Sequence, residues 1–108
     1  MALRLTQQIL ERESEAYRGS GGTSEESGHR GFRPAFLDTR TAVVYPSRFC
    51  DGTPAPFHCI AGLPNDVIAE RDPAGRVVSV HGAVVSGFVR DGVFFTRDEA
   101  AACVATAH

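Results

Sequence analysis

The segment that most constrains this chain is a pair of short β-prone runs separated by only two residues. The runs are Phe88–Arg90 and Val93–Thr96, and the residues between them are Asp91-Gly92. Asp and Gly tolerate the positive φ that a two-residue type I′ turn requires, and β-branched and aromatic side chains favour strands. The sequence therefore predicts a tight β-hairpin near the C-terminus.

The two-residue turn also predicts which residues lie opposite one another. It pairs Val89 with Phe94 and Phe88 with Phe95, and side chains alternate between the two faces of a strand. Both faces of the hairpin are then apolar, so we expect it to be buried or half-buried. We also expect its first strand to extend upstream through a bend or bulge at Gly87.

A helix start follows the hairpin directly. Thr96 and Glu99 have capping-box spacing, in which the Thr hydroxyl accepts from the Glu amide and the Glu carboxylate accepts from the Thr amide. Asp98 and Glu99 also suit the positive end of the helix dipole. We therefore predict a helix from Glu99 to about Ala107, whose alanines allow a close approach to a sheet.

The pattern of these elements is G-F-V-x-x-G-x-F-x-T-R-x-E-A-A, over residues 87–101. It resembles the ending of many uncharacterised bacterial and phage proteins. The resemblance implies a bacterial protein. Because the pattern contains no catalytic residue, it transfers no functional site.

The composition excludes several classes of function. With 108 residues and a net charge of −2, the chain is expected to form one domain without the basic surface that attracts nucleic acids or anionic membranes. All eleven basic residues are arginines, which excludes Schiff-base and P-loop chemistry because both need a lysine. We expect no cofactor, no nucleic-acid partner and no membrane association.

Cellular location is inferred from two further features. The sequence has neither a signal-peptide pattern nor the ~18 to 20 consecutive apolar residues of a membrane span, so the cytoplasm is the expected location. The three cysteines, Cys50, Cys59 and Cys103, have no paired spacing, and we expect reduced thiols. If the protein is exported, two of the three cysteines could form one disulfide bridge.

An amphipathic helix is predicted over residues 2–17. Leu5, Ile9, Leu10 and Tyr17 fall on one side of it at about 100° per residue. Three interpretations stay open. The helix covers the sheet of its own domain, it docks a protein partner or a second copy through these four side chains, or the segment is a disordered leader.

The chain divides at a glycine- and serine-rich stretch. Residues 19–31, GSGGTSEESGHRG, contain no large apolar side chain, which is typical of a flexible linker. We therefore expect an N-terminal segment (1–18), a linker (19–31) and a single α+β domain (32–108).

Two further hairpins are predicted within that domain. The first joins Ala35–Leu37 to Ala42–Tyr45, and the second joins Val67–Arg71 to Arg76–Val80 through an Asp-Pro-Ala-Gly turn. A rival interpretation of the second hairpin begins a helix at Pro64.

Between these hairpins lies a proline-rich stretch. Ser47–Pro56 is predicted to be an irregular loop that its prolines make rigid, and Phe57–Ile60 a short strand. Together, the predicted elements form a small α+β fold with a mainly antiparallel sheet of sequential hairpins. A C-terminal helix packs on this sheet, a mobile helix precedes it, and both helices are expected on one face.

Reactive side chains gather only around this loop. In a thiol enzyme, Cys50 or Cys59 would be the nucleophile, His58 or His81 the base, and Asp51 would orient that base. In a metal site, the two cysteines and two histidines would supply the ligands that zinc prefers. The spacing argues against the metal, because adjacent residues on a strand point to opposite faces.

Three functions follow as hypotheses. The first is a non-catalytic protein-interaction module that binds through the N-terminal helix, favoured because no assembled active site is visible. The second is a small thiol- or metal-dependent enzyme centred on Cys50, Asp51, His58 and Cys59. The third is a module that binds a small ligand or nucleic acid on an apolar sheet face.

Overall fold

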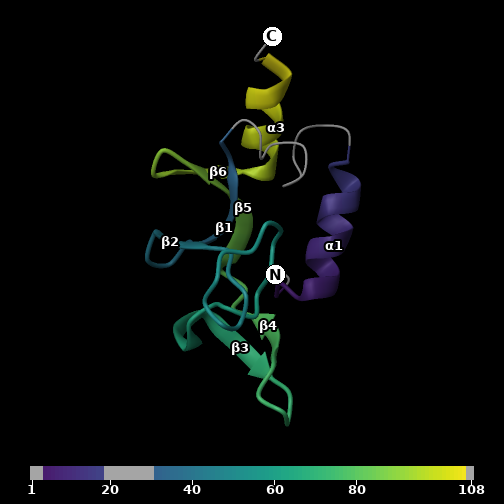
Figure 1. The fold of residues 1–108 in the computed structure, drawn as a ribbon, viewed down its shortest axis with the longest axis vertical. Coiled ribbons are helices and arrows are strands. Elements are labelled where there is room, and N and C mark those ends of the chain that lie inside the picture. Colours follow the sequence, from purple (N-terminus) through teal and green to yellow (C-terminus); the bar gives the residue numbers. More distant parts are fainter. Residues whose placement is uncertain (1–3, 19–30, 107–108) are drawn as a thin grey trace.

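Six strands and two α-helices make up the described part of the chain (Figure 1). The structure is a computed structural model that describes residues 4–18 and 31–106. In chain order the elements are α1 (Gln7–Ala16), β1 (Arg33–Asp38), β2 (Val43–Pro46), the single 3₁₀ turn η2 (Asn65–Val67), β3 (Ile68–Arg71), β4 (Val77–Val80), β5 (Val84–Arg90), β6 (Val93–Thr96) and α3 (Arg97–Thr106). None of the described helices is long and apolar enough to cross a membrane.

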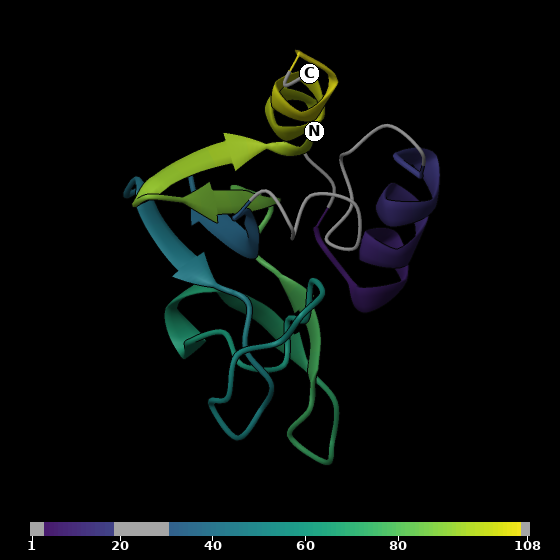
Figure 2. The same ribbon diagram turned by 45° about the horizontal axis from the view of Figure 1, so that its top comes forward.

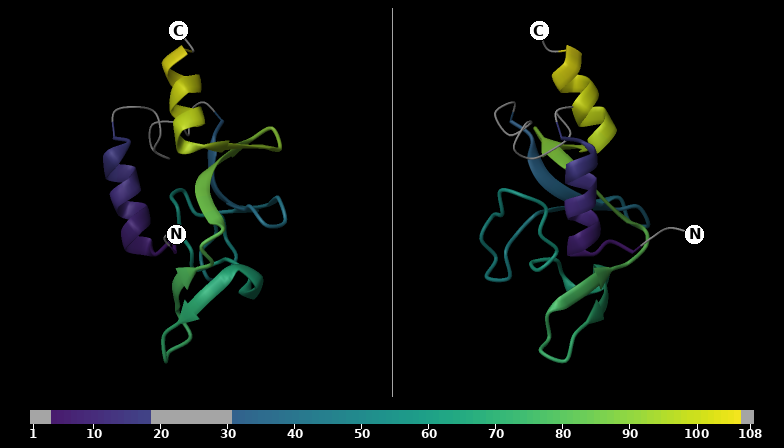
Figure 3. Two further views of the ribbon diagram at one scale, coloured as in Figure 1. Left: turned by 180° about the vertical axis from the view of Figure 1, so that it is seen from behind. Right: turned by 90° about the vertical axis from the view of Figure 1, so that its right-hand side faces the viewer.

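The strands form two antiparallel sheets. Four of them follow the order β2-β1-β5-β6, and β3 pairs with β4 alone. Pairing of β1 with β5 joins the first hairpin to the last, while the middle hairpin projects from the end of the molecule opposite α3 (Figures 1 and 3). The predicted fold class is confirmed: sequential hairpins form a small α+β structure, with α3 packed on the sheet.

The C-terminal hairpin has the predicted register. Val89 lies opposite Phe94, and Phe88 lies opposite Phe95. The turn residues Asp91-Gly92 have φ values of 52° and 78°, as a type I′ turn requires. The short-range signals in this segment therefore determine its structure.

The capping box is also confirmed. The Glu99 amide donates to Oγ1 of Thr96 at 3.1 Å, and the Thr96 amide donates to Oε1 of Glu99 at 2.9 Å. The helix begins at Arg97 rather than at Glu99. Because Thr96 is the capping residue, Arg97 and Asp98 already form the first turn.

β5 runs through Gly87 without the expected bulge. Its register with both neighbouring strands is continuous there. A Cβ at this position would lie 2.3 Å from the carbonyl oxygen of Phe95 and 2.4 Å from the Phe94 ring. The glycine is thus needed for the close approach of β6.

The middle segment forms a hairpin, as predicted, and not the rival helix from Pro64. Ile68–Arg71 pairs with Val77–Val80, and Gly75 in the turn has φ +84°. Helical structure here is limited to one 3₁₀ turn, Asn65–Val67, just before the first strand.

Phe57–Ile60 does not form the predicted strand, because side chains satisfy its backbone. Oγ of Ser47 donates to the Phe57 carbonyl at 2.8 Å and accepts from the Cys59 amide at 2.7 Å. The Gln7 amide group donates to the His58 carbonyl at 2.7 Å and accepts from the Ile60 amide at 3.3 Å. No partner strand is needed for a segment whose polar groups are paired in this way.

The N-terminal helix packs on its own domain. Leu5 and Leu10 are buried in the main core with Phe36 and Val84, and Ile9 packs against it. These apolar side chains are therefore unavailable to a partner. The helix begins at Gln7, not Ala2, because the Thr6 hydroxyl accepts from the Ile9 amide at 3.1 Å and caps it. Residues 1–3 and the predicted linker residues 19–30 lie outside the described residues.

Both helices cover the same face of the four-stranded sheet. Phe36 lies opposite Ser86, so by alternation Phe36 and Phe88 share a face. Phe36 belongs to the core under α1, and Phe88 packs with Ala100 of α3. Figure 2 shows α3 at the β6 end of this sheet and α1 beside the sheet. Within residues 4–18 and 31–106, no helix lies on the other face of the sheet.

Candidate functional site

A buried polar network joins α1, β5 and α3, and Arg97 is its centre. The Arg97 side chain is only 3% exposed. Its Nη2 donates to Oγ of Ser14 at 3.2 Å and to Nδ1 of His58 at 3.0 Å, and its Nε lies 3.4 Å from a Glu13 carboxylate oxygen. The same Glu13 oxygen accepts from Oγ of Ser86 at 2.8 Å. Burial lowers the pKa of Arg97, and Glu13 opposes that shift.

Both ring nitrogens of His58 are engaged in this network. Because Arg97 can only donate, Nδ1 accepts, and Nε2 carries the hydrogen that it donates to the Gly87 carbonyl at 2.6 Å. Burial and, after it, the Arg97 charge lower the pKa of His58 from 6.5 to about 3, although the bond to Gly87 opposes the shift. The imidazole is therefore neutral and held in one tautomer.

A second link ties the end of α1 to the start of α3. The Tyr17 hydroxyl donates to the Asp98 carboxylate, and this bond raises the pKa of Tyr17. The guanidinium of Arg97 lies 5.9 Å from the centre of the Tyr17 ring. Polar contacts therefore hold α1 against the rest of the domain, in addition to the packing of its few apolar side chains.

Arg97 and Glu13 are absent from the site residues predicted from the sequence. One signal was available, because a cation in the first turn of a helix is unfavourable next to the positive end of the helix dipole. An arginine there, between capping residues, indicates that its charge is used elsewhere. The acidic partner, 84 positions earlier (97 − 13), had no local signature.

The thiol-enzyme candidates are not joined into a catalytic group. Cys50 is exposed and Cys59 is buried, and no hydrogen bond links either thiol to His58 within the described residues. Asp51 accepts from the amide and the hydroxyl of Thr53, which lowers its pKa, and so it orients its own turn rather than a histidine. A neutral His58 with both nitrogens occupied has no site left for a proton from a thiol.

Hydrogen bonds occupy ring nitrogens of both histidines proposed as metal ligands. His58 has no free nitrogen, and Nδ1 of His81 accepts from the Ala83 amide at 3.0 Å. Within residues 4–18 and 31–106, no group of three or more His, Cys, Asp or Glu residues is arranged to hold a metal ion.

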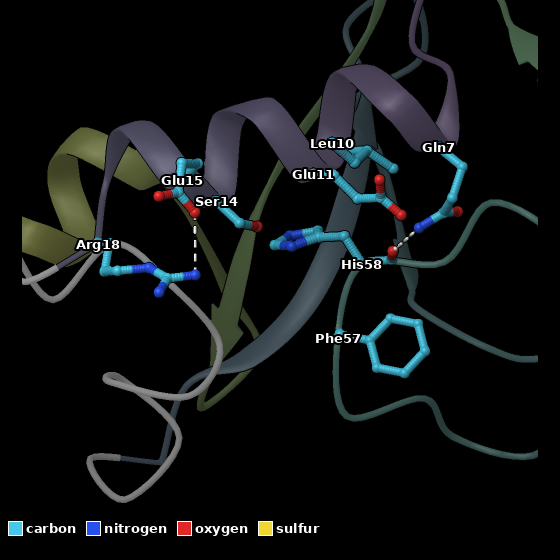
Figure 4. A pocket seen from close by; sticks show the side chains of 8 residues that line it. All are labelled: Gln7, Leu10, Glu11, Ser14, Glu15, Arg18, Phe57 and His58. Atoms are coloured by element: carbon cyan, nitrogen blue, oxygen red, sulfur yellow. Dashed lines mark hydrogen bonds and ion pairs between the residues drawn. The ribbon is translucent and has the colours of Figure 1, made fainter.

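Two hollows lie beside α1. The smaller, of about 350 Å³, is drawn in Figure 4, where the His58 ring points toward Ser14 and a Glu15–Arg18 ion pair of 2.9 Å lies farther along the helix. The larger, of about 820 Å³, lies between α1, the 57–63 segment and the β3–β4 hairpin, and both Cys50 and Cys59 line it. Each is lined by side chains of both charge signs.

The uncovered face of the four-stranded sheet is apolar. By strand register, five partly exposed side chains share this face, and none packs against either core cluster. They are Leu37, Val44, Val85, Val89 and Phe94, and we refer to them as the bare sheet face.

A groove opens at one end of the bare sheet face. It has a volume of about 620 Å³ and lies between the sheet and the Ser47–Pro56 loop. Its lining includes Pro46, Pro54, Pro56, Val89 and Arg33, and we call it the proline groove. Arg33 is the only charged side chain in that lining.

No family model matches this chain, and no curated protein or solved structure is similar enough to be counted as a match.

Proposed function

We propose that this chain is a protein-interaction domain that binds its partner through the bare sheet face. The observation that supports this proposal is the one-sided sheet, in which both helices cover the face of Phe36 and Phe88, while on the opposite face Val85 is exposed and the other four side chains of the bare sheet face are partly exposed. Val85, on a central strand, is 38% exposed. Apolar side chains that gather on one accessible face of a folded domain often mark an interaction surface.

This proposal moves the expected contact from the N-terminal helix to the sheet. Leu5 and Leu10 belong to the core, so removing residues 1–31 would damage the fold and could not test association. The bare sheet face can be altered without that difficulty, because its side chains make no contact with either core cluster in the described structure.

A charge placed on this face tests the proposal. Val85→Glu puts a carboxylate in the middle of the patch, and Val78→Glu is the matched control, since Val78 is 42% exposed but lies on β4. Circular dichroism and thermal unfolding show whether both variants fold. Immobilised wild type and Val78→Glu are expected to retain the same proteins from a cell extract, and Val85→Glu to lose them. Equal retention by all three would remove the proposal.

A thiol- or metal-dependent enzyme centred on Cys50, Asp51, His58 and Cys59 is less well supported. The neutral His58 has both ring nitrogens in hydrogen bonds and so cannot act as the base, and the Asp51 carboxylate accepts a hydrogen bond from the Thr53 amide of its own turn. Thiol-reactivity measurements with metal analysis test it, and an activated thiol or bound metal would revive it. A small-ligand function has the 820 Å³ hollow in its favour, a volume that suits a small molecule.

A further inference from the structure

We infer that the partner of this domain is an extended peptide segment that lays apolar side chains on the bare sheet face and places a carboxylate on Arg33 in the proline groove. This inference rests on the proposed function and adds the chemistry of the partner. Three observations carry it: the position of the groove, its single charge, and the size of the surface.

The groove and the sheet face form one continuous surface. Arg33 lies opposite Val89, and both alternate with residues whose side chains point to the covered face. Pro46 lies opposite Ala35 in the next row, on the same face. Arg33, Val89 and Pro46 all line the groove, so an occupant of the groove also touches the sheet.

The wall of the groove is held in place before anything binds. Within the loop, the Ala55 amide donates to the Ser47 carbonyl at 3.0 Å and the Phe49 amide donates to the Thr53 carbonyl at 2.9 Å. At Gly62 an added Cβ would lie 2.5 Å from the Arg48 carbonyl oxygen, which shows how tightly the loop is seated. A preformed groove avoids the entropy cost of ordering a loop on binding.

The charge in the groove has no partner within the described structure. Arg33 is exposed and takes part in no ion pair or hydrogen bond there, whereas four other arginines are paired with carboxylates. The proline rings beside it have no N–H to donate. A guanidinium among apolar rings favours a planar carboxylate, which it can bind with two parallel hydrogen bonds.

The size of the surface distinguishes a peptide from a second copy. β1 has six residues and β5 seven, so these strands span about 20 Å at about 3.4 Å per residue, and β2 and β6 have four residues each. With strands about 4.8 Å apart, the face covers roughly 340 Å². A stable dimer buries about 800 Å² on each partner. An extended segment of about six residues spans the same ~20 Å, so the surface fits a peptide and is too small for a dimer.

Two labelled peptides test the inference. Each has nine residues with a central Val-Ile-Phe-Val, flanked by glutamates in one and by lysines in the other, and fluorescence anisotropy measures their binding to full-length protein. Wild type is expected to bind the glutamate peptide about fivefold or more tightly than the lysine peptide, because attraction at Arg33 is exchanged for repulsion. Arg33→Glu should reverse that preference. Arg76→Glu, which changes the net charge equally at an exposed position outside the groove, should behave as wild type.

Amide chemical shifts give a second readout that does not depend on a variant. On titration with the glutamate peptide, the shifts are expected to move at Val85 and Val89 and to stay fixed on the β3–β4 hairpin. Movement at the hairpin alone would overturn the inference.

The other outcomes separate this inference from the proposed function. If neither peptide binds, or if Arg33→Glu keeps the wild-type preference, the peptide inference fails, and the proposed function stands or falls with Val85→Glu. A dimer in sedimentation velocity that Val85→Glu dissociates would make a second copy the occupant, which overturns the inference and keeps the proposed function. If Val85→Glu also changes no association, both are lost.

Discussion

Replacing His58 with glutamine tests the central electrostatic argument about this fold. In the folded protein, burial and then the Arg97 charge lower the pKa of His58 from 6.5 to about 3. In the unfolded chain the imidazole takes up a proton near pH 6.5. Between these two values the unfolded state binds one proton more than the folded state, so the His58 contribution to stability is fully present above pH 6.5 and is lost as the pH falls toward 3.

The magnitude follows from the two pKa values. The free energy of unfolding should fall by ~2 kcal/mol between pH 7 and pH 5 from this group alone, and by ~4 kcal/mol between pH 7 and pH 3. Glutamine keeps an amide N–H that can donate to the Gly87 carbonyl but takes up no proton in this range. It also loses the ring contacts with Phe36 and Phe88, so the variant should be less stable at every pH, with a flatter pH dependence.

Urea unfolding followed by circular dichroism, at pH 7, 6 and 5, measures the effect. The quantity of interest is the difference between the two pH profiles, because contributions from His81 and the carboxylates are common to both proteins and cancel. The stability of wild type should fall toward that of the variant as the pH is lowered. Parallel profiles would refute the assignment of a buried, neutral His58 beside Arg97.

Three further substitutions, one of them with a matched control, test other parts of the structure. Glu13→Gln leaves Arg97 buried without its carboxylate and should lower the free energy of unfolding in urea titrations by about 1 to 3 kcal/mol. The loss is smaller than for a fully enclosed ion pair because the Glu13 side chain is 33% exposed. The control Glu15→Gln breaks an exposed ion pair and should cost under about 0.5 kcal/mol, and equal losses for the two variants would count against the buried network. Leu10→Ala should cost about 2 to 4 kcal/mol in the same assay, whereas an undocked helix would show no change. Gly87→Ala should lower the thermal midpoint and cost about 1 to 3 kcal/mol, because its methyl group would overlap the backbone of β6; an unchanged midpoint would contradict that close approach.

Local signals in the sequence were sufficient where all the interacting residues are near in the chain. The turn at Asp91-Gly92 and the capping box of Thr96 and Glu99 each depend on a few consecutive residues, and their geometry follows from backbone preferences and hydrogen bonds within that span. The same holds for the hairpin closed by Gly75. These elements, and with them the α+β class, were determined by the sequence alone.

Long-range contacts decided the rest. Whether Phe57–Ile60 became a strand depended on Ser47 and Gln7, which supply its hydrogen bonds from other parts of the chain. The state of His58 depended on Arg97, 39 positions away. No local sequence pattern predicts the contacts of Ser47 and Gln7 with Phe57–Ile60 or the contact of Arg97 with His58.

The candidate binding surface shows the same division most clearly. The alternation of the C-terminal hairpin placed Val89 and Phe94 on one face and Phe88 and Phe95 on the other, both apolar. The sequence could not say which face would be covered. Packing of α1 and α3 decided it, because one layer of helices covers only one side of a sheet, and the other side is the one that we propose as the binding surface.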